Sequence, residues 1–200
     1  MTKLIFATGN NNKLKEIREI MENTGFDIIS SKDAGIELDV EETGTTFEEN
    51  ALIKARAVAK LSGTLTLSDD SGLEIDYMDK APGIYSARFL GHDTDYDYKN
   101  NYILDKLKDV PKEKRTARYV CAVAAVWPDG REEVVRETFE GYIGFEQKGH
   151  NGFGYDPIFM VPEYEKTAAE IGPDQKNAIS HRGKALRKMR EILTETQGRQ

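Results

Sequence analysis

The sequence predicts an α/β protein whose mixed β-sheet is flanked by helices. Segments with helical periodicity alternate with short apolar runs, a pattern typical of a sheet covered by helices. The middle of the chain instead holds β-rich segments joined by tight turns, which favours a mixed sheet over a purely parallel one. A chain of 200 residues suits one domain, residues 1–200, or one domain with two lobes.

The first half of the chain predicts two helices among short strands. One helix begins near Asn12, where apolar residues start to recur at helical spacing, and Gly25 supplies its left-handed cap. The other begins at Thr46, which forms a capping box with Glu49, and it ends at Gly63. We expect the strands of this half at residues 4–7, 26–30, 64–67 and 73–77, with a turn at residues 68–72 between the last two.

The second half predicts a β-hairpin and two further helices. Residues 116–127 and 133–139 are β-rich, and Pro128-Asp129-Gly130 between them is a favoured hairpin turn. One helix is expected over residues 95–109 and another after Ser180, which caps it. We also expect short strands at 142–145 and 157–161, a glycine-rich loop at 149–154 and a frayed polar tail at 194–200.

The composition argues against several classes of protein. The net charge of −7 at pH 7 disfavours general binding to nucleic acid or to an anionic membrane, because both need a positive field. The one cysteine, Cys121, lies in an apolar run, where a buried core thiol is preferred to a nucleophile, and it fits a reducing compartment. No apolar run reaches the length of a membrane span, so we expect a cytoplasmic protein without membrane or nucleic-acid partners.

The turn after the first strand is a candidate anion site. A strand that ends here and runs directly into a helix presents backbone N–H groups, the positive end of a helix dipole and a lysine to one point. The segment lacks the glycine-lysine-serine ending of a Walker loop, so an ordinary turn with a solvated lysine is at least as good an interpretation of it alone. The candidate residues are Thr8, Gly9, Asn10, Asn11, Asn12 and Lys13.

Two acidic segments are candidate metal sites. Asp69 and Asp70 are adjacent, so their carboxylates point in different directions, and one can ligate a metal while the other caps a turn or bonds a neighbouring group. Magnesium prefers oxygen ligands, commonly one or two carboxylates with phosphate oxygens. A glutamate of the Glu41-Glu42 pair completes such a site if its loop faces Asp70. Alone, each segment is better explained by a surface turn or a solvated loop.

The loop that contains Glu41 and Glu42, here called the acidic loop, is followed by a helix with two cations whose roles are open. Lys54 and Arg56 can balance the charge of the carboxylates or contact phosphate. Salt bridges on the helix surface are the alternative, and they are favoured for Arg56.

The glycine-rich loop is a candidate site for a flat ligand. Two glycines let the backbone approach such a ligand closely, and Phe153 or Tyr155 offers a stacking face. Glycines beside an aromatic residue also occur in plain turns, and the embedded carboxylate of Asp156 favours the functional interpretation.

A cluster of cations precedes the last helix. Lys176, His181 and Arg182 gather near its amino terminus, where positive charge opposes the helix dipole. A phosphate or a purine carbonyl is the natural compensation. Exposed cations that are simply tolerated are the alternative, above all for Lys184.

Together these segments resemble the inosine triphosphate pyrophosphatase family, which hydrolyses non-canonical purine nucleoside triphosphates. The resemblance covers almost the whole chain, and its motifs occur in the family's order. They are TGN at 8–10 with Lys13, EETG at 41–44 with TFEENA at 46–51, DDSGL at 69–73, APGIYSAR at 81–88, GFGYDP at 152–157 and SHRG at 180–183.

The resemblance implies hydrolysis of ITP, dITP or XTP between the α- and β-phosphates, with Mg²⁺ as cofactor, by a homodimer. It also implies an elongated mixed sheet in two lobes, with the substrate in a central cleft. By position, residues 8–13 hold the phosphates, Glu41 and Asp70 bind the metal, and Asp70 is also the assigned proton acceptor. The implied contacts to the rest of the substrate are Ser71, Phe153, Gly154, Tyr155, Asp156, Lys176, His181 and Arg182.

Hydrogen-bond chemistry explains the choice of base. Hypoxanthine and xanthine carry an acceptor at position six, where adenine carries an amino donor. Donors from Lys176, Arg182 or backbone N–H groups suit that acceptor and are left unpaired by adenine, which allows rejection by several powers of ten. GTP shares the six-oxo group, and nothing in the sequence identifies what excludes it.

Two alternatives to this function remain. A Maf-type pyrophosphatase of pyrimidine nucleoside triphosphates is the nearest, and the SHRG motif argues against it. A non-catalytic nucleotide sensor or RNA-binding module is disfavoured by the acidic balance of the chain and by carboxylates near the presumed phosphate site.

Overall fold

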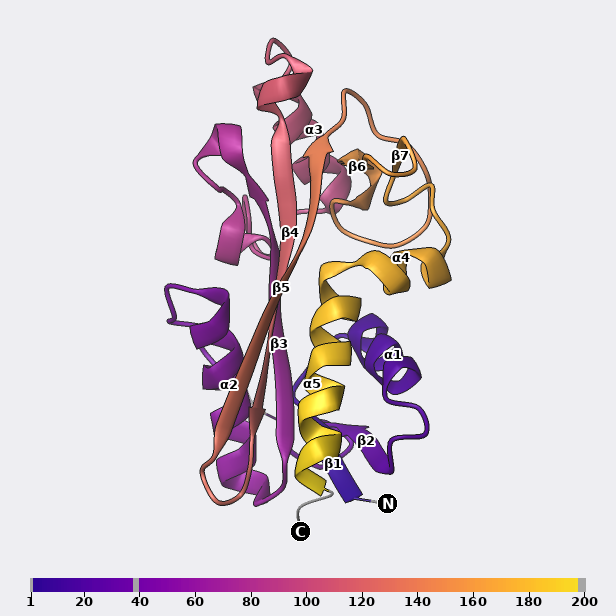
Figure 1. The fold of residues 1–200 in the computed structure, drawn as a ribbon. Helices are drawn as coiled ribbons and strands as arrows, with labels where there is room; N and C mark the ends of the chain where they lie inside the picture. The colour runs from indigo at the N-terminus through magenta and orange to yellow at the C-terminus, as the bar shows by residue number, and fades with distance from the viewer. Residues whose placement is uncertain (1, 38–39, 198–200) are drawn as a thin grey trace. The chain divides into compact units, whose positions relative to one another are not determined.

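A computed structural model describes residues 2–37 and 40–197 (Figure 1). Leu38 and Asp39, which precede the Glu41-Glu42 pair, lie outside the described residues, as do residues 198–200 of the expected tail. The described strands form a seven-stranded sheet in the order β2-β1-β3-β4-β5-β6-β7. Because β1 pairs in parallel with β2 and β3 while β6 pairs antiparallel with β5 and β7, the sheet is mixed, and the predicted α/β class is confirmed.

The bounds of the strands and helices are as follows. The strands are β1 (Thr2–Phe6), β2 (Phe26–Ser30), β3 (Thr66–Ile75), β4 (Thr116–Val126), β5 (Glu132–Ile143), β6 (Phe159–Val161) and β7 (Lys166–Thr167). The α-helices in the described part of the chain are α1 (Asn11–Ile20), α2 (Phe47–Ser62), α3 (Tyr96–Lys106), α4 (Pro173–Ile179) and α5 (His181–Gln197). None of these helices combines the length and the apolar character needed to cross a membrane.

The chain divides into two compact units, which are described separately. Unit 1 comprises Met1–Asp70, Cys121–Glu137 and Arg182–Gln200, and unit 2 comprises Ser71–Val120 and Thr138–His181.

The core of unit 1 lies on both faces of its strands. Successive side chains of a strand point to opposite faces, and β1 uses both. Leu4 and Phe6 pack in a cluster with apolar residues of α1 and α5, whereas Ile5 and Ala7 pack with Val58 of α2. Accordingly, α1 and α5 lie on one side of these strands and α2 on the other (Figure 1).

The core of unit 2 combines apolar residues of α3 and of its strands with aromatic side chains. Ile103 of α3 and Leu107, which directly follows this helix, are buried in the cluster that also contains Phe139 and Phe159. Arg115 is fully buried, and its guanidinium donates to main-chain carbonyls of Leu107, Val110, Ile143 and Gly144. These bonds give the buried guanidinium charge-assisted partners on the main chain.

The predicted bounds of α2 are confirmed, and those of α1 are confirmed only at its start. Thr46 caps α2 by accepting a hydrogen bond from the Glu49 amide at 3.1 Å, and Gly63 ends the helix in a left-handed conformation. Helix α1 ends earlier than expected, at Ile20, and the chain then turns through Asn23 and Gly25 at positive φ. Asparagine tolerates that conformation better than most residues, so the turn starts before the glycine.

The predicted turn at residues 68–72 is wrong, because β3 runs through it without a break. An Asp-Asp-Ser-Gly sequence favours a surface turn, but both aspartates find partners that let them stay in a buried strand. β5 likewise runs from Glu132 to Ile143 as one strand. Helix α4 and strand β7 were not predicted, since each is too short to show a periodic pattern.

Candidate active site

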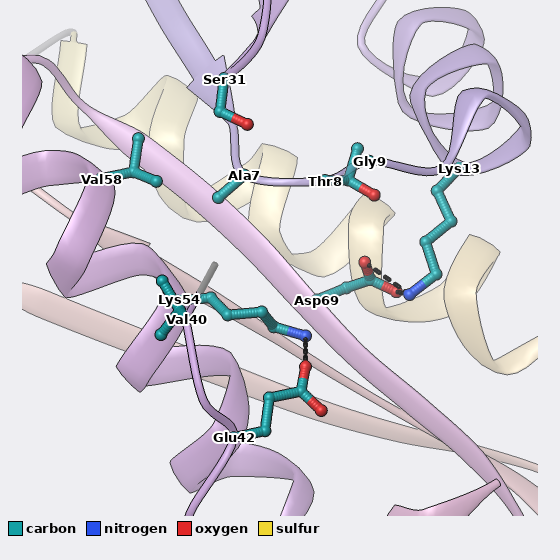
Figure 2. Close-up of a pocket in the computed structure, with 10 residues that line it drawn as sticks. All are labelled: Ala7, Thr8, Gly9, Lys13, Ser31, Val40, Glu42, Lys54, Val58 and Asp69. Atoms are coloured by element: carbon teal, nitrogen blue, oxygen red, sulfur yellow. Dashed lines mark hydrogen bonds and ion pairs between the residues drawn. The ribbon is translucent and has the colours of Figure 1, made fainter. Parts of the chain in front are cut away.

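Unit 1 contains a cavity of about 260 Å³ beyond the ends of β1 and β2. Ligands of parallel α/β sheets bind at such strand ends, where loops and helix starts converge. The cavity is lined by Ala7, Thr8, Gly9, Lys13, Ser31, Val40, Glu42, Lys54, Val58 and Asp69 (Figure 2). Two lysines and two carboxylates therefore face a space large enough for a small charged ligand.

The start of α1 differs from the expected anion site in one respect. The side chain of Asn10 caps the helix and accepts hydrogen bonds from the amides of Asn12 at 2.9 Å and Lys13 at 3.3 Å. The Asn10 amide in turn donates to Thr8 Oγ1 at 3.1 Å. An N-cap side chain therefore satisfies the amides of Asn12 and Lys13, so these two are not among the backbone N–H groups left for an anion at this turn. The cation of this turn, Lys13, does reach the cavity (Figure 2).

Asp69 binds two cations that are distant in sequence. Lys13 Nζ lies 3.0 Å from Asp69 Oδ1 and 2.9 Å from Oδ2, and Arg182 Nε lies 3.4 Å from Oδ2. Arg182 Nη1 also bonds Glu16 Oε2 at 2.7 Å. Burial alone raises the pKa of Asp69, but the charges of Lys13 and Arg182 outweigh it and hold the pKa well below its usual range. Asp69 is therefore an ionised carboxylate that fixes both cations.

Asp70 has a different environment from its neighbour. Its carboxylate is 7% exposed, accepts a hydrogen bond from Asn50 Nδ2 at 3.1 Å and lies 3.9 Å from Lys54 Nζ. Burial, with a further contribution from the charge of Glu42, raises the pKa of Asp70 to about 6 despite Lys54 and Asn50. An exposed aspartate has an ordinary pKa near ~4.

The glutamates of the acidic loop are placed differently. Glu42 lines the cavity, and Lys54 Nζ lies 2.5 Å from its Oε1 (Figure 2). Glu41 is exposed. The loop thus approaches Asp70 as expected, and Lys54 balances carboxylate charge. Arg56 pairs with Glu132 at 2.6 Å on the surface, which confirms the salt-bridge interpretation for that residue.

The donor set fits magnesium bound together with phosphate. Within residues 2–37 and 40–197, no group of three or more histidine, cysteine or acidic side chains is close enough to hold a metal alone. The carboxylates of Asp70 and of a glutamate in the acidic loop are hard oxygen donors, and magnesium commonly takes one or two carboxylates plus phosphate oxygens. These donors are compatible with magnesium only when phosphate oxygens complete its coordination.

In unit 2, the glycine-rich loop folds around the carboxylate of Asp156. Its Oδ2 accepts a hydrogen bond from the Phe153 amide at 2.9 Å and lies 2.5 Å from Lys176 Nζ. Its Oδ1 accepts a hydrogen bond from the hydroxyl of Tyr119 at 3.1 Å. Gly152 has φ +73°, and a Cβ there would lie 2.1 Å from Asp156 Oδ2, so only glycine fits.

The aromatic residues of this loop differ in exposure. Phe153 is half-buried, with Lys176 Nζ 5.1 Å from its ring centre. Tyr155 is 3% exposed, packs edge-on against Tyr96 and donates its hydroxyl to the Ser86 carbonyl at 2.7 Å. Of the two candidate stacking faces, the geometry favours Phe153.

Two further predicted residues, His181 and Ser71, are neighbours in sequence of Arg182 and Asp70. His181 is buried at the start of α5, and its ring stacks on Tyr119 at 4.8 Å with an interplanar angle of 10°. Ser71 is half-buried in β3 directly after Asp70. Asn50 and Tyr119 were not among the predicted site residues. No local pattern marks a buried tyrosine within an apolar strand as a polar partner.

The chain is similar to proteins of one family over nearly its whole length. A model of the Ham1 family matches residues 4–192. A dITP/XTP pyrophosphatase of Exiguobacterium sibiricum is 50% identical to the chain, over 96% of this chain and 97% of that protein. One of Bacillus subtilis is 47% identical, over 96% of this chain and 98% of that protein. A solved HAM1 protein from Coxiella burnetii has a TM-score of 0.91 at 40% identity, over 98% of this chain and 100% of that chain.

Proposed function

Because this chain belongs to the Ham1 family, we propose that it hydrolyses non-canonical purine nucleoside triphosphates to the monophosphate and pyrophosphate. The relatives named dITP/XTP pyrophosphatase support dITP and XTP as substrates, and ITP shares the same base as dITP. The family resemblance drawn from the sequence is confirmed. The observation that carries the proposal is the charged cavity in which Lys13, Asp69 and Glu42 lie together.

The cavity of unit 1 is the proposed site of the triphosphate. Lys13 and Lys54 bring two ammonium groups to it, and Asp69 holds Lys13 in place. Attack on the α-phosphorus increases charge on its oxygens, so positioned cations stabilise the transition state more than the ground state. We propose that Thr8, Gly9 and Asn10 shape the turn that admits the phosphates.

Asp70 is the proposed metal ligand and proton acceptor. We assign Glu41 as the second ligand, because Glu42 already pairs with Lys54 within the chain. Bound magnesium supplies positive charge against the phosphate oxygens. Asn50 fixes the orientation of the Asp70 carboxylate through its 3.1 Å hydrogen bond, so that Asp70 can receive a proton from the attacking water.

The cluster around Asp156 in unit 2 is the proposed site of the base. Phe153 offers a stacking face, and Lys176 offers a donor to the six-oxo group of hypoxanthine or xanthine. Adenine presents a donor at that position and offers the lysine no acceptor, which disfavours ATP. Ser71, His181 and Arg182 complete the proposed contacts.

Further expectations extend the proposal. The resemblance to the family implies two lobes with the substrate in a central cleft, Mg²⁺ as the physiological metal, and a homodimer. A cytoplasmic location is supported by Cys121, a buried thiol outside any disulfide, which suits a reducing compartment. Sedimentation equilibrium of the purified protein tests the dimer, and a single species of monomer mass contradicts it.

A substrate panel tests the function directly. We expect pyrophosphate, and not orthophosphate, from dITP, ITP and XTP in the presence of Mg²⁺. ATP should be turned over at least about a hundredfold less efficiently, since the proposed site offers a donor to a six-oxo acceptor that adenine lacks. GTP shares that acceptor, and its expected poor turnover rests on the family resemblance alone. Comparable turnover of ATP contradicts the specificity, and preference for pyrimidine nucleotides favours the Maf-type alternative. Tight binding of dITP without hydrolysis favours a sensor.

A further inference from the structure

Tyr119 in β4 is a buried polar residue to which the proposed mechanism gives no role. Its side chain is 8% exposed and lies in the core of unit 2, with its ring 4.6 Å from that of Phe159. Its hydroxyl donates to Asp156 Oδ1 at 3.1 Å. The same ring stacks on His181 at 4.8 Å with an angle of 10°. Tyr119 thus contacts two of the residues assigned to the base.

Asp156 itself is occupied by groups of the chain. It is 1% exposed, and both of its oxygens accept: Oδ1 from Tyr119, and Oδ2 from the Phe153 amide and Lys176. A carboxylate engaged on both oxygens acts by holding its donors in place. Asp156 therefore orients Phe153 and Lys176 and is not suited to read the base itself.

The hydroxyl of Tyr119 is placed to restrict rotation of the Asp156 carboxylate, which orients Phe153 and Lys176. The last torsion of an aspartate is broad and roughly two-fold, so a carboxylate held on one oxygen swings easily. A donor on Oδ1 restricts that rotation and aligns Oδ2 with both of its partners. Burial and the neighbouring Asp156 charge raise the pKa of Tyr119 well above its usual value, so the hydroxyl keeps its proton and remains the donor.

We propose that Tyr119 is a positioning residue for the base, which holds Lys176 and the Phe153 backbone through Asp156 and holds His181 through its ring. The inference rests on the proposed function, because it assumes that these groups bind a purine. It predicts that the Tyr119 hydroxyl affects binding and selectivity for the base and leaves the chemical step nearly unchanged.

Tyr119→Phe removes only the hydroxyl and keeps the stacked ring. With dITP we expect KM to rise about tenfold and kcat to change less than about threefold, since the lost bond to a buried charge weakens substrate binding and not the bond-breaking step. The ratio of kcat/KM for dITP over dATP should fall about tenfold, because dATP does not use the lysine donor. Tyr142→Phe, on half-buried Tyr142 of β5, is the matched control and should match wild type.

A double-mutant cycle separates positioning from general loosening of unit 2. If Tyr119 acts through Asp156 on Lys176, then Tyr119→Phe should change KM less than about twofold in a Lys176→Met background. The same tenfold rise in both backgrounds overturns the proposal. Thermal unfolding of each variant precedes the kinetics. If Tyr119→Phe does not fold at the assay temperature, Asp156→Asn carries the test, with raised KM supporting the proposal and reduced kcat at unchanged KM overturning it.

The assay also distinguishes failure of the proposed function from failure of the inference about Tyr119. Absence of pyrophosphate release from dITP by the wild-type protein refutes the proposed function, and the inference about Tyr119 falls with it. An active wild type, with Tyr119→Phe unchanged in KM and in selectivity, overturns the inference and leaves the function standing.

Discussion

Asp69 and Asp70 are neighbours in β3, and their partners give them opposite chemical character. Asp69 faces Lys13 and Arg182, which stabilise its charge, whereas Asp70 is buried near the charge of Glu42. The first is suited to structure and charge balance, and the second to binding a cation or a proton. The residue types alone predicted that the pair divides its roles, and the family resemblance assigned the metal and the proton to Asp70.

Asp69→Asn should destabilise the protein by about 3 kcal/mol or more, because it leaves the buried guanidinium of Arg182 with one carboxylate fewer. The folded-state pKa of Asp69 lies below its ordinary value of 3.8. Its contribution is therefore fully present above that value and is lost as the pH falls through the folded-state pKa. Urea unfolding of wild type and variant should differ most at neutral pH and converge in strong acid.

Arg56→Ala is the control for this prediction. It breaks an ion pair whose side chains are 54% and 30% exposed, and such a pair contributes less than about 1 kcal/mol. An Asp69→Asn variant no less stable than Arg56→Ala contradicts the role given to Asp69.

The two glutamates of the acidic loop are a second matched pair. Glu41→Gln should raise the Mg²⁺ concentration for half-maximal activity by about tenfold or more, an effect typical of groups that support a metal. Glu42→Gln should change it less, because Glu42 pairs with Lys54. Titration of pyrophosphate release against Mg²⁺ gives both values. A larger effect of Glu42→Gln moves the assignment to that residue.

Elements whose boundaries depend on neighbouring residues were predictable, and those that depend on distant partners were not. The cap at Thr46 and the left-handed Gly63 are local signals, and α2 begins and ends there. The continuity of β3 depends on Lys13 and Arg182, which are 56 and 113 residues from Asp69 along the chain. No local propensity contains that information, so a turn was the natural but wrong expectation.

The glycine-rich loop depends on Gly152 for its shape. Gly152→Ala places a Cβ against Asp156 Oδ2 in a left-handed backbone, so the loop must shift. We expect a KM for dITP raised at least about tenfold, because Phe153 and Lys176 lose their common acceptor. Gly130→Ala is the control, since Gly130 has φ +87° with open space around it, and it should cost about 1 kcal/mol of stability without changing KM. Equal KM values for the two variants contradict this reading of the loop.

The sequence predicted which residue types take part in the proposed chemistry of the whole chain. The structure adds which of these residues pair with one another. Lys13, Glu42 and Lys54 were candidates from their motifs, and they line one cavity of unit 1. Asn50 and Tyr119 had no sequence signal of their role, because a buried hydrogen bond is defined by its partner and not by its own residue type.

The central claim is that Asp70 serves hydrolysis of dITP to pyrophosphate, and one measurement tests it. Initial rates of pyrophosphate and orthophosphate release from dITP with Mg²⁺ are compared for wild type and Asp70→Asn, after thermal unfolding shows both to be folded. We expect pyrophosphate alone from wild type and a rate at least about a thousandfold lower from Asp70→Asn, the loss typical when a catalytic group is removed. Release of orthophosphate by wild type, or retention of most activity by the variant, contradicts the account.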